Sequence, residues 1–497
     1  ATQMGLVLQQ TAVSVNVKQR RDYSCAVFDS CGMLLANAPH VPVHLGAMGQ
    51  TVRATIDAFP AMQPGDVFVT NDPYQGGSHL PDLTVITPVF DSEESSPVMF
   101  VANRAHHADI GGISPGSMST QATRLGQEGV VISPMHLHTF GESRLAEFRE
   151  FLMSAAHPPR NVEENLADIG AQCAANERGL ELLEQYAASE SWARLNEYSE
   201  HLLSAAEQRV LQFLQEHKLE PSQFQDELDD GSQICVSVTP SPDGRLEVDF
   251  TGTSQENTGN FNANPSIVSA ATIYVLRCLI ADDMPLNEGV LRAVELTIPA
   301  GLLNPRPAPA RSNSPAVAAG NVETSQRVVD VLLGALGAAA ASQGTMNNLL
   351  FGNEHFGFYE TICGGSGATA NRSGASCVHT HMTNTRLTDP EVLEKRYPIR
   401  LIQCQQRGGS GGVGAQRGGD GLIREIEFLE PVSVSLLMSR RRTQPFGLQG
   451  GGSGAAGENR LTTVEGNSSL DGCCNFEAQP GERLQIKTPG GGGFGCD

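Results

Sequence analysis

Two short segments of the chain, residues 71–82 and 103–112, carry most of the side chains whose types and spacing could do chemistry. Their histidines and nearby acids are His79, Asp82, His106, His107 and Asp109. Imidazole nitrogens together with a carboxylate are ligands for Mn²⁺, Fe²⁺ or Zn²⁺, and neither segment holds the thiolates of a closed structural zinc site. These residue types therefore favour an open, catalytic metal site.

Two β-like runs lie between these segments. Residues 83–90 and 98–102 are apolar and rich in valine, and the stretch that joins them is polar, which predicts a β-hairpin. Because a hairpin returns the chain to its starting point, the two polar segments are expected to meet at one end. We expect one divalent transition metal there. Its predicted ligands are His79, Asp82 and His106, with His107 and Asp109 as alternatives.

Further histidines lie outside the hairpin. His379 and His381 alternate along a segment expected to be extended, so they face one side together and allow paired substrate contacts or a second ligand set. A structural network is an equal alternative for them. The same alternatives hold for His40 and His44, and His44 is not counted among the metal ligands.

Composition narrows the class of protein. The chain has 497 residues with 55 acids against 33 bases, a net charge of −22, which argues against nucleic acid or an anionic membrane surface as a partner. No apolar stretch approaches the ~20 residues of a membrane span, and no leader opens the sequence, so we expect a cytoplasmic protein. The eleven scattered cysteines, without a C-x-x-C pair, are typical of reduced thiols.

The start of the chain is unusual. Ala1 stands where an initiator methionine would, and an apolar helical pattern follows at once. We therefore expect a trimmed chain or the C-terminal part of a longer polypeptide.

Patterning along the chain predicts a large mixed α+β fold. Residues 1–160 form a β-rich segment with the metal-binding hairpin, residues 161–220 a helical segment that breaks near 186–189 into two helices, and residues 221–497 a mixed segment with Gly-rich β structure. Within the last segment, helices are expected at 266–280 and 323–341, the second capped by Asn321.

The glycine clusters of the last hundred residues contain one G-x-G-x-x-G match, at residues 409–414. A dinucleotide site needs a strand before this motif and a helix after it. Here a strand-like run follows instead, and no P-loop motif occurs anywhere in the chain. Glycine-rich turns and tight backbone packing are therefore the preferred interpretation. Nucleophilic serine or cysteine chemistry is disfavoured as well, since no G-x-S-x-G elbow is present and Cys25 lies in an apolar strand pattern.

Six runs resemble the hydantoinase B/oxoprolinase family, over nearly the whole chain. They are RRDYSCAVFD (20–29), APHVPVHLGAM (38–48), GGSHLPDLTVITPVF (76–90), HHADIGGISPGSM (106–118), HTHMTNTRLTDPE (379–391) and TPGGGGFG (488–495). Within the family, the runs are most similar to the C-terminal half of the ATP-dependent oxoprolinases, which open 5-oxo-L-proline to L-glutamate. N-methylhydantoinase B subunits and the carboxylase subunits of acetone and acetophenone carboxylases are the alternatives.

The resemblance implies a hydrolase of cyclic amides that works with a partner. The partner is an actin-like ATPase (hydantoinase A) subunit or a fused N-terminal half, which binds ATP and Mg²⁺ and phosphorylates the ring amide, so the assembly is a hetero-oligomer or a homodimer of a fused chain. This chain would then hydrolyse the phosphorylated intermediate with its metal, which is Mn, Zn or Fe. A scaffold subunit without chemistry would leave the converging histidines unexplained.

Roles for individual residues follow from the same resemblance. The residues assigned to catalysis, as general base or in orienting the ligands, are Asp72, His107, Asp109 and Asp22. A salt bridge with Arg20 or Arg21 is an equal alternative for Asp22. The residues assigned to substrate binding are His379, His381 and Arg386.

Overall fold

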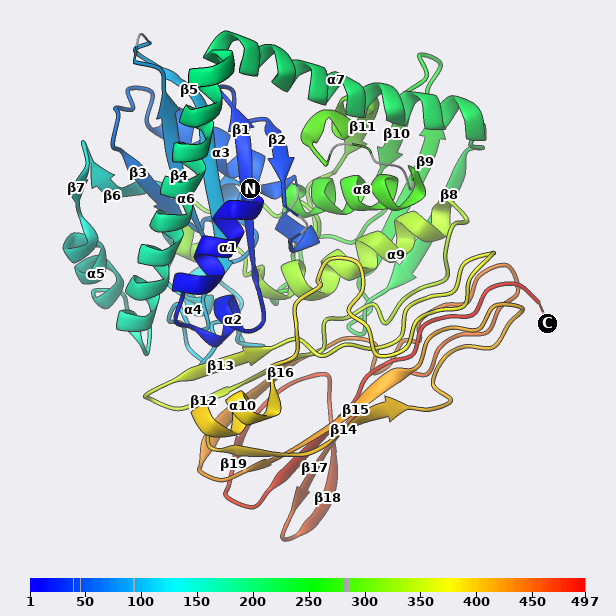
Figure 1. The fold of residues 1–497 in the computed structure, drawn as a ribbon. Helices are drawn as coiled ribbons and strands as arrows, with labels where there is room; N and C mark the ends of the chain where they lie inside the picture. The colour runs from blue at the N-terminus through cyan, green and yellow to red at the C-terminus, as the bar shows by residue number, and fades with distance from the viewer. Residues whose placement is uncertain (39, 45, 93, 281–283, 285, 497) are drawn as a thin grey trace.

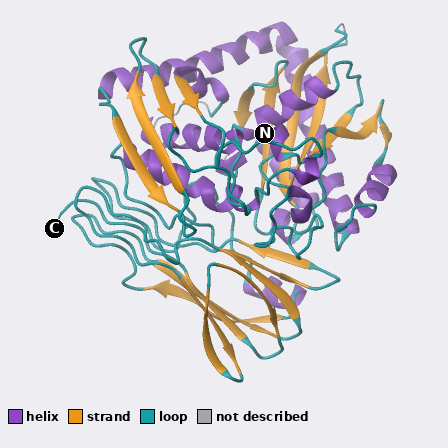
Figure 2. Ribbon diagram, turned by 180° about the vertical axis from the view of Figure 1, so that it is seen from behind, coloured by secondary structure: helices purple, strands orange, loops and turns teal. Residues whose placement is uncertain are grey.

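The computed structural model describes residues 1–497 except 39, 45, 93, 281–283, 285 and 497. It confirms the mixed α+β class, with helices and sheets that alternate along the chain (Figures 1 and 2). No helix among the described residues has the length and apolar character needed to cross a bilayer.

The N-terminal part is built on a seven-stranded sheet of order β2-β1-β5-β4-β3-β6-β7. Its strands are β1 (Tyr23–Asp29), β2 (Leu34–Asn37), β3 (Val67–Thr70), β4 (Asp82–Phe90), β5 (Pro97–His106), β6 (Met135–Thr139) and β7 (Glu142–Ser143). Strands β4 and β5 pair antiparallel, which confirms the predicted hairpin, and residue 93 of its turn lies outside the described residues. The hairpin extends further than expected at the end that carries Asp82 and His106.

Helices cover both faces of this sheet. On one face α1 (Thr2–Thr11) and α6 (Val162–Glu190) pack against side chains such as Cys25 and Val101. On the other face α3 (Ala47–Ala58) packs against Phe28 and Phe100. Because both faces are covered, the central strands β4 and β5 are buried at nearly every position rather than at every second one.

The predicted pair of central helices is present as α6 and α7 (Trp192–His217), and the break between them falls at Ser191. Helix α7 runs along the top of the molecule in Figure 1. The smaller helices of this half of the chain are α2 (Val15–Lys18), α4 (Leu125–Glu128) and α5 (Leu145–Met153).

A four-stranded sheet of order β11-β10-β9-β8 follows in the middle of the chain. Its strands are β8 (Ser222–Glu227), β9 (Gln233–Pro240), β10 (Leu246–Asp249) and β11 (Val294–Thr297). Helices α8 (Pro265–Ile280) and α9 (Ser325–Ala335) share the core formed by the apolar side chains of β9 and β10. The predicted helix at 266–280 is confirmed. The second helix is shorter than predicted, and a π-helical turn, η5 (Gly320–Thr324), precedes it.

The C-terminal part contains two further sheets, of order β13-β12-β16-β19 and β14-β15-β20-β17-β18. Their strands are β12 (Asn348–Gly352), β13 (Gly357–Glu360), β14 (Ile399–Arg407), β15 (Gly421–Phe428), β16 (Val432–Leu437), β17 (Glu458–Thr463), β18 (Gly466–Leu470), β19 (Cys473–Ala478) and β20 (Arg483–Lys487). One helix, α10 (Pro390–Arg396), lies beside them in Figure 1.

The glycine clusters form extended segments that run side by side toward the C-terminus (Figures 1 and 2). Their backbones are hydrogen-bonded to one another, for example from Gly412 N to Gly491 O at 2.9 Å. A Cβ added at Gly491 would lie 1.9 Å from the carbonyl oxygen of Ser366. Only glycine permits this backbone approach. The match at 409–414 lies in this bundle between β14 and β15, without the helix that a dinucleotide site needs.

Candidate metal centre

Strand register brings two of the predicted ligands together. Asp82 opens β4 and pairs directly with His106, the last residue of β5, so their side chains share one face of the sheet. His106 Nδ1 lies 3.2 Å from Asp82 Oδ1. His79, in the turn before β4, places Nε2 3.1 Å from His106 Nδ1 and 3.4 Å from Asp82 Oδ1. The three ligand atoms thus lie within 4.8 Å of one another, and all three residues are buried.

A fourth side chain, His44, contacts this cluster from outside the hairpin. Its Nε2 lies 3.2 Å from Asp82 Oδ2, and its Nδ1 lies 2.8 Å from Ser24 Oγ. Burial alone would raise the pKa of Asp82, but the neighbouring His79 and His44 hold that pKa well below its usual range. Asp82 is therefore a carboxylate at neutral pH. Burial lowers the pKa of His106, which favours the neutral imidazole that a metal binds.

Asn321, in the π-helical turn, contacts the ring nitrogen of His79 that is not directed at His106 and Asp82. Its Nδ2 lies 2.9 Å from His79 Nδ1, and its Oδ1 is buried without a hydrogen-bond partner among the described residues. A histidine that binds a metal through Nε2 carries its proton on Nδ1 and donates it to an acceptor. Since the two ends of an amide are nearly interchangeable in shape, Oδ1 can take that position. Asn321 then selects the tautomer that leaves His79 Nε2 free.

Replacing Asn321 tests this role. Asn321→Leu keeps a similar volume but removes the acceptor, so we expect a ~10–100-fold loss of Mn²⁺ affinity, the usual cost of losing an outer partner. Asn321→Asp keeps an acceptor and should bind Mn²⁺ at least as tightly as the unmodified protein. Titration calorimetry with Mn²⁺ alone measures both. Equal losses in the two variants would contradict the tautomer role.

The cluster faces a small internal cavity of about 20 Å³, enough for a single ion or water. Asp22 and Tyr359 also line this cavity. The Tyr359 ring stacks on His106 with ring centroids 4.4 Å apart, and Arg20 lies over the same ring at 4.9 Å. Asp22 is thus the one predicted catalytic acid that borders the cavity.

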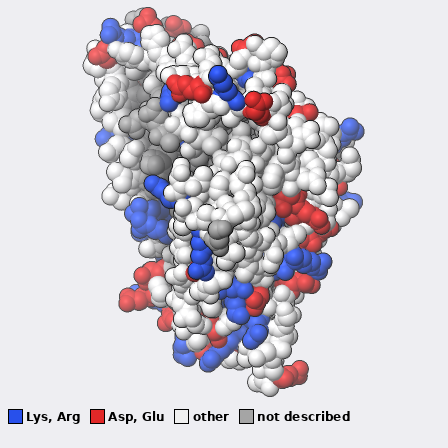
Figure 3. Space-filling model, turned by 90° about the vertical axis from the view of Figure 1, so that its right-hand side faces the viewer, with Lys and Arg blue, Asp and Glu red and all other residues white. Residues whose placement is uncertain are grey.

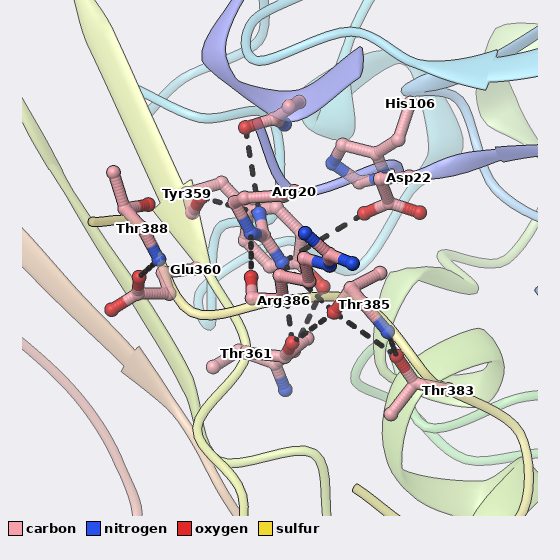
Figure 4. A network of polar contacts seen from close by, with 12 residues as sticks. Arg20, Asp22, His106, Tyr359, Glu360, Thr361, Thr383, Thr385, Arg386 and Thr388 are labelled. Carbon is pink, nitrogen blue, oxygen red and sulfur yellow. Dashed lines mark hydrogen bonds and ion pairs between the residues drawn. The ribbon is translucent and has the colours of Figure 1, made fainter. Parts of the chain in front are cut away.

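Arg20 links several segments of the cavity wall through hydrogen bonds (Figure 4). The guanidinium is fully buried and donates to the carbonyl oxygens of Tyr359 and Arg386, at 2.6 and 3.3 Å. It also contacts the hydroxyl oxygens of Thr361 and Thr385 and lies 3.8 Å from Asp22. The salt bridge between Asp22 and Arg20, one of the two roles predicted for Asp22, is therefore present.

The other residues assigned to catalysis lie away from the cavity. His107 follows His106 and points to the opposite face of the sheet, where its ring nitrogens contact Asn165 and Gln172 of α6. The Asp109 carboxylate accepts hydrogen bonds from the backbone of Gly111 and pairs with Arg160 at 2.8 Å. These groups therefore fix the loop after β5.

Asp72 and the segment that holds His379 and His381 also make contacts of their own. Asp72 caps a 3₁₀ turn by accepting from Tyr74 N, and it pairs with Arg311 at 2.9 Å. His381 lies 3.1 Å from Asp330 of α9. Both ring nitrogens of His379 are buried without a hydrogen-bond partner in the described part of the chain, and burial lowers its pKa to about 3. From their segment, Met382 and Thr383 line the metal cavity instead.

Tyr359 and Asn321 were not assigned to the site from the sequence, and His44 was left open between substrate or ligand contacts and a structural network. Tyr359 and His44 belong to segments whose place beside the hairpin depends on tertiary packing. Asn321 was expected to cap a helix, but no side chain caps α9, and the Asn321 amide contacts His79 instead. The one available signal was a lone asparagine within the apolar run 315–322, which is buried almost throughout.

Glu323, two residues after Asn321, is a buried acid. Its Oε1 accepts hydrogen bonds from Met346 N and Asn348 Nδ2 at 3.0 and 2.8 Å. Its Oε2 has no partner among the described residues. Burial raises the pKa of Glu323 from 4.5 to about 8. The folded protein therefore keeps a proton that the unfolded chain releases. The stabilising contribution of this group is complete below about pH 4.5 and is lost as the pH rises toward about 8.

Replacing Glu323 tests this dependence. Glu323→Gln keeps an amide oxygen for the same hydrogen bonds and cannot lose a proton. We therefore expect its Tm to fall less than that of the unmodified protein between about pH 5 and about pH 8. Thermal unfolding across this range is the measurement, with exposed Glu465→Gln as the control. Parallel curves for Glu323→Gln and the unmodified protein would show that Glu323 is not the group responsible.

Comparison with known proteins places this geometry in context. The chain is 47% identical to 5-oxoprolinase 1 of Arabidopsis thaliana over its full length, but it spans only 41% of that protein. It is 36% identical to an uncharacterized protein of Methanocaldococcus jannaschii and spans 88% of it. The ATP-dependent caprolactamase from Pseudomonas jessenii shares the fold, with a TM-score of 0.89 at 23% identity, over 100% of this chain and 88% of that one.

The family assignment is supported along the entire sequence. The chain spans about 40% of the length of the curated 5-oxoprolinases that it matches, including that of Saccharomyces cerevisiae. The family pattern, by contrast, matches all of residues 1–497. The chain therefore belongs to the Hydantoinase B/oxoprolinase family.

Proposed function

We propose that this chain is the metal-dependent hydrolytic half of an ATP-dependent cyclic amidohydrolase that opens 5-oxo-L-proline to L-glutamate. The observation that carries the proposal is the buried cluster of His79, Asp82 and His106, in a chain similar over its whole length to proteins named 5-oxoprolinases. A cytoplasmic location is part of the proposal and fits its eleven free thiols.

The donor set fits a divalent transition metal. Two imidazole nitrogens and a carboxylate oxygen converge without any thiolate, the pattern for Mn, Fe or Zn in an open site. His79, Asp82 and His106 would hold the ion, and the Asp22 carboxylate lines the same cavity. When bound, such a metal lowers the pKa of a coordinated water toward ~7 and so makes hydroxide available at neutral pH.

The residues of the chain supply orientation and proton transfer. His44 Nε2 donates to Asp82 Oδ2 and so fixes the carboxylate toward the two imidazoles. Asp22, held near Arg20 at the cavity wall, accepts the proton of the attacking water as general base. His107, Asp109 and Asp72 hold the surrounding loops. The segment that holds His379, His381 and Arg386 forms part of the cavity wall, and we assign substrate binding to it.

The activation of the lactam, which precedes hydrolysis, belongs to a partner. A lactam amide is a poor electrophile, so the carbonyl needs activation before water attacks. We assign that step, with ATP and Mg²⁺, to an actin-like ATPase half, since the described part of this chain contains no strand–loop–helix phosphate cradle. The partial coverage of the plant and yeast 5-oxoprolinases leaves room for such a half, fused or separate.

Metal removal tests the proposal. After treatment of the assembled enzyme with a chelator and removal of that chelator, glutamate formation from 5-oxo-L-proline and ATP should fall to background, and Mn²⁺, Zn²⁺ or Fe²⁺ should restore it. Mock-treated enzyme is the control. Full glutamate formation by enzyme shown by elemental analysis to be free of metal would refute a metal-dependent hydrolysis.

A further inference from the structure

A second cavity, of about 330 Å³, borders the segments that close the metal centre. Asp22 lines the metal cavity, whereas its neighbours Arg21 and Tyr23 line the second one. In the same way Thr383 lines the metal cavity, whereas Asn384 and Arg386 line the second. Because residues adjacent in the chain line different cavities, these two short segments form a wall between the two cavities.

The second cavity is rich in positive charge and hydrogen-bond donors. Arg21 and Arg386 are both exposed, and neither guanidinium forms an ion pair with any described residue. None of the described residues that line this cavity carries a carboxylate. In a chain with 55 acids and 33 bases, two unpaired arginines in one hollow are unexpected. Acidic and basic side chains are interspersed elsewhere, as on the face in Figure 3.

His40 adds a neutral donor to this cavity. The backbone N–H of Cys25 donates to His40 Nδ1 at 3.0 Å, so the proton of the neutral ring is on Nε2. Burial lowers the pKa of His40 to about 4, which keeps the ring neutral. The Nε2 edge faces α1, where a Cβ on Gly5 would lie 2.7 Å away. The donor is thus fixed in tautomer and in place on the cavity wall.

The two arginines are held in place by the backbone that carries them. Arg386 N donates to Arg20 O, and Arg20 Nε donates back to Arg386 O at 3.3 Å. This pairing ties the two arginine-bearing segments together beside Asp22 (Figure 4). Arg21 itself has a φ of 57°, a left-handed conformation that is uncommon outside glycine. Such strain persists where the surrounding structure enforces it, often at functional sites.

Size separates the tasks of the two cavities. The metal cavity of about 20 Å³ admits an ion or a water but no ring compound. The second cavity, of about 330 Å³, reaches the ~300 Å³ at which small-molecule sites begin. Of these two cavities, only the second is therefore large enough for a ring compound. Guanidinium groups recognise carboxylate and phosphoryl oxygens with paired hydrogen bonds.

We propose that this cavity, the Arg21–Arg386 pocket, binds the oxyanion of the ring compound on which the metal centre acts. The oxyanion is either the carboxylate of 5-oxo-L-proline or the phosphoryl group added by the partner. The choice of ring compound rests on the proposed function, whereas the anion specificity of the pocket does not. The pocket thus selects anionic lactams over neutral ones.

Calorimetry on the full chain tests this assignment with 5-oxo-L-proline, the neutral lactam 2-pyrrolidinone and inorganic phosphate as probes. The double variant Arg21→Gln/Arg386→Gln should lose at least ~10-fold in affinity for the anionic probe that binds, as expected for charge-assisted hydrogen bonds. Arg372→Gln, which removes an exposed arginine outside the pocket, should bind like the unmodified chain. The charge-retaining Arg21→Lys/Arg386→Lys should keep part of the affinity. The metal content of each variant is measured as well, and an unchanged value shows that the neighbouring metal centre is intact.

The outcomes separate the two sources of the oxyanion. Binding of 5-oxo-L-proline that depends on the arginines assigns the pocket to the carboxylate, and arginine-dependent binding of phosphate alone assigns it to the phosphoryl group. Binding of neither anion, or unchanged binding in Arg21→Gln/Arg386→Gln, overturns the proposal. Because these measurements need no turnover, they stand even if the assembled enzyme hydrolyses no lactam, a result that would count against the proposed function alone.

Discussion

Replacing His79 by alanine is expected to abolish glutamate formation and metal binding together while the fold survives. His79 offers Nε2 to the cluster at 3.1 Å from His106 and 3.4 Å from Asp82, so its loss removes one of three ligands. The loss of metal affinity should exceed the ~10–100-fold cost of removing an outer partner. ATP hydrolysis by the partner half should continue in part, since activation of the amide precedes the lost step.

Metal content, glutamate formation and circular dichroism of His79→Ala are the measurements. His355→Ala is the matched control, because His355 is an exposed loop residue whose side chain is 77% accessible. His44 is unsuitable as a control, since its contact with Asp82 gives His44→Ala an effect on the site. A His79→Ala variant that retains metal and full glutamate formation would contradict the assignment of the catalytic centre and direct attention to His379 and His381.

The second large effect concerns the partner. This chain by itself should not open 5-oxo-L-proline, with or without ATP, and adding the ATP-binding half should restore turnover coupled to ATP hydrolysis. The reason is chemical, because a lactam amide is a poor electrophile and the proposed activation of its carbonyl needs the ATP-binding half. Glutamate formation and phosphate release are followed for the chain, the partner half and their mixture. ATP-independent activity of the pure single chain would refute this division of labour.

The sequence predicted that Asp82 and His106 lie together, because local strand geometry decides their positions. Residues 83–90 and 98–102 form strands that are buried on both faces, and their antiparallel pairing places Asp82 and His106 opposite each other. The prediction was less specific for residues near the strand ends. His107 follows His106, and only the register of β5 decides that His106 faces the cavity while His107 faces α6.

Tertiary packing decided what the sequence left open. Asn321 reaches His79 across 242 positions of sequence, and no local pattern encodes such a contact. The same holds for the stacking of Tyr359 on His106. Long-range contacts of this kind depend on how the C-terminal sheets pack against the N-terminal half, and hydrophobic periodicity carries no information about that packing.

A metal held by His79, Asp82 and His106 can be located by diffraction. Crystals of the metal-loaded protein, with anomalous diffraction data collected on either side of the absorption edge of Mn, Fe or Zn, test it most directly. We expect one strong anomalous peak at the convergence of His79 Nε2, His106 Nδ1 and the Asp82 carboxylate, at ~2.0–2.2 Å from each ligand atom. A fully loaded crystal whose only peak lies elsewhere, with these three side chains still hydrogen-bonded to one another, would contradict it.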